Sequence, residues 1–129
     1  MTGLGPPLHC ADEQFDLIYA FSVFTHLGVV QQRAWLVELR RILCPRGFLV
    51  LSTHGDVYRQ ELKPDQLTKY LAGEIVVTLS SKEGKNDCAT YHPPRAFRSL
   101  VADTFDVIDF VPQGAQGNPV QDLWLCRRK

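Results

Sequence analysis

The chain has 129 residues, of which 45 % are apolar and 22 % are charged. This is the composition of one folded domain, so we expect a single domain over residues 1–129 and no extended disorder. Fourteen Lys and Arg residues balance fourteen Asp and Glu residues. No overall field would therefore attract nucleic acid or an anionic membrane, and we expect neither as a partner.

The four cysteines are scattered without a C-x-x-C spacing. This pattern gives no indication of a metal site and is typical of a protein in the reducing cytosol rather than of a secreted disulfide scaffold. Residues 1–7 have neither a basic flank nor an apolar segment, which argues against a signal peptide. We therefore predict a cytoplasmic protein without a bound metal.

The first half of the chain predicts a strand, a helix and a second strand. Residues 15–21 are a near-continuous run of strand formers, typical of a parallel strand covered on both faces. Apolar residues recur at helical spacing from 28 to 43, with Gly28 as the N-cap and Pro45 and Gly47 ending the helix. Residues 47–52 follow as a second buried strand, which completes a right-handed βαβ unit.

The second half predicts shorter elements. Residues 64–71 and 93–102 have the pattern of short helices, and the β-prone residues 74–79 lead into an exposed polar loop at 80–87. Residues 105–111 and 122–126 indicate two strands that are antiparallel, because no helix connects them. The expected fold class is α/β: a mostly parallel partial sheet with an antiparallel terminal strand and helices packed on it.

Three segments together resemble a known family. Residues 7–18 are similar to its "LPF-x-D-x-x-FD-hydrophobic" segment, and residues 21–27 to the segment that follows the strand. Residues 38–49 resemble its "E-x-x-R-hydrophobic-L-K-P-G-G" element, with Arg46 in place of the first glycine of the turn. Residues 114–122 also resemble the turn before the final strand in one subgroup. These segments resemble the C-terminal half of the class I S-adenosylmethionine-dependent methyltransferases that act on small molecules.

The resemblance implies a partial, Rossmann-like methyltransferase domain. The family's glycine-rich loop and the acidic residue that binds the cofactor ribose belong to an N-terminal half that these segments do not include. We therefore expect S-adenosylmethionine to bind only if another chain completes the site.

The resemblance also implies a set of site residues. The wall beside the methionine part of the cofactor would include Phe21, Ser22 and Val23, and the adenine side Leu8, His9 and Cys10. For Phe21 and Val23, burial in the core is an equal alternative.

Three histidines and a tyrosine are further candidates. His26 would orient substrate or act as a general base, or else cap the start of the helix. His54 lies just beyond the second strand, where such enzymes receive substrate. Tyr91 and His92 would shape the substrate pocket, or else anchor the helix that follows them.

Three functions remain open from the sequence. The chain is a methyltransferase acting on a small-molecule nucleophile, a non-catalytic remnant that binds a partner, or an unrelated small α/β ligand-binding domain. Half of a doubly wound sheet leaves one edge of its first strand exposed, so we predict a homo-oligomer that covers this edge.

Overall fold

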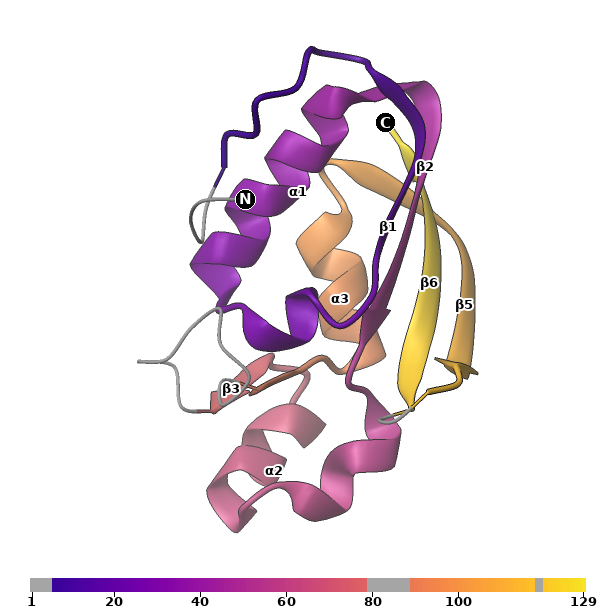
Figure 1. Ribbon diagram of the computed structural model, residues 1–129. Coiled ribbons are helices and arrows are strands. Elements are labelled where there is room, and N and C mark those ends of the chain that lie inside the picture. The colour runs from indigo at the N-terminus through magenta and orange to yellow at the C-terminus, as the bar shows by residue number, and fades with distance from the viewer. Residues whose placement is uncertain (1–5, 79–88, 118–119) are drawn as a thin grey trace.

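The computed structural model describes residues 6–78, 89–117 and 120–129, and its main body is a four-stranded sheet (Figure 1). The order of its strands is β1-β2-β6-β5. Their bounds are Phe15–Ala20 for β1, Leu43–Thr53 for β2, Phe105–Ala115 for β5 and Gln121–Arg128 for β6. The predicted α/β class is confirmed, but the sheet is mixed rather than mostly parallel, since β1 and β2 form a parallel pair whereas β2 with β6 and β6 with β5 form antiparallel pairs.

Helices α1 (Val29–Ile42) and α3 (Pro94–Val101) lie on the same face of this sheet (Figure 1). A smaller unit contains α2 (Pro64–Leu71) and a short antiparallel pair, β3 (Val76–Thr78) and β4 (Ala89–Tyr91). Two 3₁₀ turns, η1 (Phe24–His26) and η2 (Asp56–Glu61), follow β1 and β2. The loop predicted at residues 80–87 lies outside the described residues.

The predicted βαβ unit is confirmed as β1, α1 and β2, with Leu17 opposite Phe48 and Ala20 opposite Leu51 in parallel register. Its boundaries differ from the prediction. The helix spans Val29–Ile42, within one residue of the predicted 28–43, but β2 begins at Leu43 rather than at Gly47. Arg46 sits inside β2 at φ 66°, the left-handed conformation that glycine adopts most readily.

The core lies between the sheet and its two helices, and Trp124 of β6 is at its centre. This side chain is fully buried, with its ring 4.3 Å from Phe97 of α3 and 4.1 Å from Phe110 of β5 between centroids. Its indole N–H donates to Thr53 Oγ1 at 2.9 Å, so the one polar atom of the ring is satisfied. From α1, Leu36, Leu39 and Ile42 pack into the same cluster.

The opposite face of the sheet carries no helix in the part of the chain that the structure describes (Figure 1). Leu17 and Tyr19 of β1 are 56 % and 69 % exposed, so the expectation that this strand is covered on both faces is wrong for these residues. The physical reason is that the crossover helix covers one face only, and side chains alternate between faces along a strand. Leu17 and Tyr19 pair with Phe48 and Val50 of β2 and form an apolar surface with them.

A buried polar pair joins α1 to the segment before α3. His92 is fully buried, and its Nε2 lies 2.7 Å from Gln32 Oε1; the Gln32 amide donates to the carbonyl of Leu27 at 2.6 Å. Burial, with a smaller effect of the neighbouring His54, lowers the pKa of His92 to about 3. The ring is therefore neutral in the folded protein at neutral pH.

Replacing Leu36 by alanine tests the one-sided core. Leu36 is 1 % exposed, so the change should lower the free energy of unfolding by about 3 kcal/mol through lost burial and the remaining cavity. Val37, the next residue on α1, is 63 % exposed, and Val37→Ala should change it by less than about 0.5 kcal/mol. Urea unfolding measures both; equal losses in the two variants would contradict this assignment of the core.

The neutral His92 predicts a pH dependence of stability. In the unfolded chain the imidazole takes up a proton near pH 6.5, whereas in the folded chain it does so only near 3. The free energy of unfolding should therefore be constant with respect to this group above pH 6.5 and fall as the pH drops from 6.5 toward 3. His92→Gln keeps a donor for Gln32 but cannot titrate, so its unfolding energy should fall less over this range. Parallel pH curves for the two proteins would exclude the effect.

Candidate functional site

The carboxyl ends of the parallel strands β1 and β2 meet at one edge of the sheet, and polar residues gather there. Ser22 follows β1, while Ser52 and His54 lie at the end of β2. Strand β6 is antiparallel to β2, with Asp122 opposite Thr53, so its first residue, Gln121, also lies at this edge. In open α/β sheets, ligands bind outside the carboxyl ends of the parallel strands.

Ser22, Ser52 and Gln121 form a continuous hydrogen-bonded group. The Ser22 backbone N–H donates to Ser52 Oγ at 2.9 Å, and the Gln121 amide donates to Ser22 Oγ at 3.0 Å. The Ser52 hydroxyl in turn donates to Gln121 Oε1. Ser52 and Gln121 are buried, whereas Ser22 is exposed, so the group connects the interior with the surface. We call these three residues the serine–glutamine group.

Ser22 has an unusual backbone conformation, with φ 58°. A serine in the left-handed region costs free energy that the surrounding structure must supply, and such residues concentrate at functional sites. Here the bonds from the Ser22 N–H and to its hydroxyl hold the turn in place. These two bonds therefore fix the direction of the Ser22 side chain at the end of β1 despite the cost of its backbone conformation.

His54 lies behind the serine–glutamine group. Its ring is largely buried, with Nε2 at 3.5 Å from Gln121 Nε2, and it contacts the rings of Tyr58 and Tyr91 at centroid distances of 5.0 and 5.3 Å. Burial lowers the pKa of His54. The imidazole is therefore neutral at neutral pH and able to accept a proton.

A hollow of about 450 Å³ lies between β1, η1 and α1. His26, the last residue of η1, lines it together with Leu8, Val23 and Trp35. Apart from His26, the hollow is lined almost entirely by apolar residues. We call it the apolar hollow; it runs along the free edge of β1.

The residues predicted for the cofactor wall are divided between these two places. Phe21 and Val23 are 49 % and 44 % exposed, so neither is packed in the core. Leu8 and Val23 line the apolar hollow. Ser22 belongs to the serine–glutamine group and also borders the apolar hollow, and His9 is exposed. Cys10 is partly buried, and its carbonyl accepts a hydrogen bond from Arg41 at 3.0 Å.

The segment that holds Leu8, His9 and Cys10 is tied to α1 by charge. Glu38 accepts the Leu8 N–H at 2.5 Å and pairs with Arg41 at 2.7 Å, which lowers the pKa of Glu38. Arg41 also pairs with Asp12 at 2.5 Å. This clamp places Leu8 against the apolar hollow.

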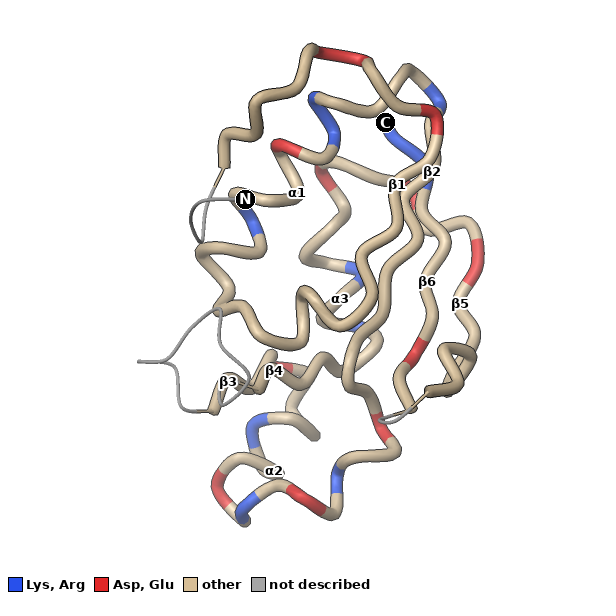
Figure 2. The backbone as a smooth tube through the Cα atoms, viewed as in Figure 1, with Lys and Arg blue, Asp and Glu red and all other residues tan. Residues whose placement is uncertain are grey.

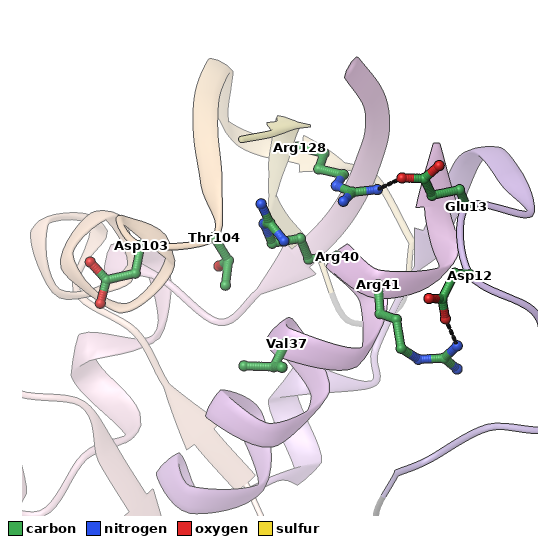
Figure 3. A pocket seen from close by; sticks show the side chains of 8 residues that line it. All are labelled: Asp12, Glu13, Val37, Arg40, Arg41, Asp103, Thr104 and Arg128. Carbon is green, nitrogen blue, oxygen red and sulfur yellow. Dashed lines mark hydrogen bonds and ion pairs between the residues drawn. The ribbon is translucent and has the colours of Figure 1, made fainter. Parts of the chain in front are cut away.

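A charged pocket of about 540 Å³ lies at the opposite end of the sheet, beyond this clamp (Figure 3). Its arginines are already engaged: Arg41 with Asp12, Arg128 with Glu13 at 3.6 Å, and Arg40 with the carbonyl of Lys129 at 2.9 Å. These bonds join the segment before β1 to α1 and β6. The arrangement is that of a structural clamp rather than of a ligand site.

Tyr91 and His92 are adjacent in sequence but occupy different surroundings. Tyr91 is partly buried against His54 and Tyr58, close to the serine–glutamine group. The His92 ring bonds Gln32, and its backbone N–H donates to the carbonyl of His54 at 2.8 Å. This is the geometry of an anchor for the segment before α3.

Ser52 and Gln121 were not among the residues singled out from the sequence. Ser52 stands two residues before His54, a spacing that places both at the end of one strand. Gln121 follows the turn whose resemblance to the family was noted, but it is separated from Ser22 by 99 positions. Only the antiparallel insertion of β6 beside β2 brings them together.

Among the described residues, no three or more His, Cys, Asp or Glu side chains are grouped so that they could hold a metal ion. No helix in these residues has the length and apolar character needed to cross a bilayer.

Comparison with known proteins gives a match to a family model over part of the chain and a shared fold. Residues 5–51 match the model of the methyltransferase domain family. That match covers β1, α1 and most of β2, the unit that carries Ser22 and His26. The search of curated proteins finds no match.

Solved structures similar to this chain include an S-adenosylmethionine-dependent methyltransferase from Methanosarcina mazei, with 15 % identity and a TM-score of 0.70 over 95 % of this chain and 63 % of that one. Another, from Mesorhizobium loti, has 14 % identity and a TM-score of 0.64 over 94 % and 65 % of the two chains.

A third is the 1,6-didemethyltoxoflavin-N1-methyltransferase of Burkholderia thailandensis, solved with its substrate and S-adenosylhomocysteine. It has 16 % identity and a TM-score of 0.60 over 92 % of this chain and 45 % of that one. The chain thus spans less than two thirds of the length of each of these structures. The family match over residues 5–51 and the shared fold confirm the predicted resemblance to part of a class I S-adenosylmethionine-dependent methyltransferase.

Proposed function

We propose that the chain takes part in S-adenosylmethionine-dependent methyl transfer to a small-molecule nucleophile, with a cofactor site that a second copy of the chain completes. The observation that carries this proposal is the family match over residues 5–51, a segment that includes Ser22 and His26 and ends one residue before Ser52. The solved methyltransferases of the same fold support the fold on which it rests.

The described residues fit one wall of a cofactor site. The apolar hollow offers Leu8, Val23 and Leu27 to the apolar parts of the cofactor, and the Ser22 hydroxyl offers a polar contact beside it. Among the described residues that line the hollow there is no Asp or Glu to bind ribose hydroxyls. The remaining wall must therefore come from elsewhere, and the free edge of β1 is the place where a further strand would close it.

S-adenosylmethionine would supply an electrophilic methyl group. The protein's main task would then be to position the acceptor and exclude water. Ser22, Ser52 and Gln121 would orient an acceptor at the end of β1. His26 would take a proton from a weakly acidic acceptor on the side of the apolar hollow, whereas His54 would act only through the Gln121 amide in front of it.

A second copy suits the free edge of β1 for reasons of charge and symmetry. Figure 2 shows no charged residue along β1 after Asp16. Around a twofold axis two β1 strands pair antiparallel, which sets Leu17 of each copy opposite Tyr19 of the other and keeps the two Asp16 carboxylates at opposite ends. The alternative function, a non-catalytic module that only oligomerises through this edge, rests on the same exposed strand.

Light scattering tests the association. The native chain should show twice its mass of 14.6 kDa, while the double variant Leu17→Lys, Tyr19→Lys should be monomeric, because lysines on an edge strand oppose pairing. Val30→Lys, at a residue of α1 that is 81 % exposed, is the matched control and should remain dimeric. A monomeric native chain at high concentration would refute pairing through β1.

Calorimetric titration with S-adenosylmethionine and S-adenosylhomocysteine separates the two functions. Methyl transfer predicts saturable binding at roughly micromolar ligand, and the loss of that binding in the lysine double variant. A dimeric chain that shows no saturation at millimolar ligand would reject the methyltransferase proposal and leave the oligomerising module.

A further inference from the structure

A pocket of about 390 Å³ opens where the serine–glutamine group reaches the surface. Its lining consists of Phe21, Leu123, the three residues of that group and the turn at 114–117. It lies on the helix-free side of the sheet, because Ser52, Gln121 and Leu123 belong to the alternate set of residues that faces away from Trp124. We call it the uncharged pocket.

The described residues that line this pocket carry no charge. The charged pocket, by contrast, is lined by three arginines and three carboxylic acids. A charged ligand bound in the uncharged pocket would lose part of its hydration without gaining an ion pair, which is unfavourable. The lining therefore selects against anions and cations.

The polar atoms of the pocket are hydroxyls and amides that both donate and accept. The hydroxyls of Ser22 and Ser52 and the amide of Gln121 already form one bonded group, so their positions are fixed before a ligand arrives. These bonds hold Ser22 in place despite its strained backbone, at φ 58°. Such an arrangement recognises a neutral group that carries hydrogen-bond donors and acceptors.

The apolar walls define the shape of the ligand. Phe21 is half exposed at the mouth of the pocket, and Leu123 lies on the sheet beside it. The turn that forms the far wall is held by the Gln113 N–H, which donates to the buried carboxylate of Asp122 at 2.9 Å. Gly114 packs so closely on Val111 that an added Cβ would lie 2.7 Å from the Val111 Cβ. A flat ring between Phe21 and this turn would use both surfaces.

We infer that the uncharged pocket binds an uncharged, planar small molecule through the exposed hydroxyl of Ser22, which Ser52 and Gln121 hold in position, with Phe21 against its ring. Its role as the methyl acceptor rests on the proposed function, whereas its binding does not. His54, 3.5 Å behind the Gln121 amide, lies close enough to influence the bound group through that amide. The pocket is built within one chain, so it should bind without a second copy.

Nuclear magnetic resonance titration of the full chain with 2-pyridone, benzoate and benzylammonium tests this inference. 2-Pyridone should shift the amide resonances of Ser22, Ser52, Gln121 and residues 114–117 and should saturate, whereas the two charged probes should not. Binding of either charged probe at these residues as tight as that of 2-pyridone, or no shift with 2-pyridone, would overturn the inference.

Variants that keep the fold sharpen the test. Ser22→Gly removes the hydroxyl and suits the left-handed backbone, so it should fold and bind 2-pyridone roughly fivefold more weakly, the loss of one neutral hydrogen bond. Phe21→Ala should weaken binding to a similar extent, about fivefold. The control Phe48→Ala, which removes a ring at the other end of the sheet, should leave it unchanged. Unchanged affinity in both Ser22→Gly and Phe21→Ala would overturn the inference.

The titration with 2-pyridone tests the pocket, and the titration with S-adenosylmethionine tests the proposed function, so either proposal can be rejected without the other. Cofactor binding without 2-pyridone binding rejects the pocket and leaves methyl transfer standing. 2-Pyridone binding without cofactor binding upholds the pocket and rejects its role as a methyl-acceptor site.

Discussion

The burial of Trp124 decides which face of the sheet the helices cover. Its ring lies against Phe97 of α3 and Phe110 of β5, and its N–H bonds Thr53 of β2, so three elements meet on one side chain. Because side chains alternate along a strand, turning Trp124 inward turns Leu123 and Leu125 outward. The apolar surface on the helix-free face is thus the direct complement of the core, and it extends through Val50 to Tyr19 at the free edge.

The same alternation builds the candidate site. Phe48, Val50 and Ser52 lie on the outward face of β2, and Leu125, Leu123 and Gln121 lie opposite or next to them on β6. On each strand these residues are apolar except at the carboxyl end of β2, where the outward residues are Ser52 and Gln121. A buried polar group is stable only if it is bonded, and each of these two residues satisfies the other. The site is therefore the polar end of an otherwise apolar sheet face.

Local pattern predicted the elements, because their signals lie within a few residues of each other. The helix at 64–71 matches α2 at both ends, since Pro64 starts it and Gly73, at φ 88°, follows its end. The extension of β2 back to Leu43 was missed because Pro45 and Arg46 do not suggest a strand. The bond from Gln121 to Ser22 could not be predicted, since it depends on the sheet order and not on spacing. Exposure of Leu17 and Tyr19 was missed because an apolar run reports a preference for burial, not the presence of a partner.

The uncharged pocket and the apolar hollow differ in how far one chain encloses them. The residues that line the uncharged pocket come from β2, β6, the end of β5, the turn between β5 and β6 and the two residues after β1, which the core of one chain already fixes. The apolar hollow, in contrast, is bounded on one side by the unpaired edge of β1, and no residue on that side restrains a bound molecule. Under the proposed function, acceptor recognition would therefore be a property of the single chain, whereas cofactor binding would require an added strand. Association through β1 would then control activity without changing the pocket that selects the acceptor.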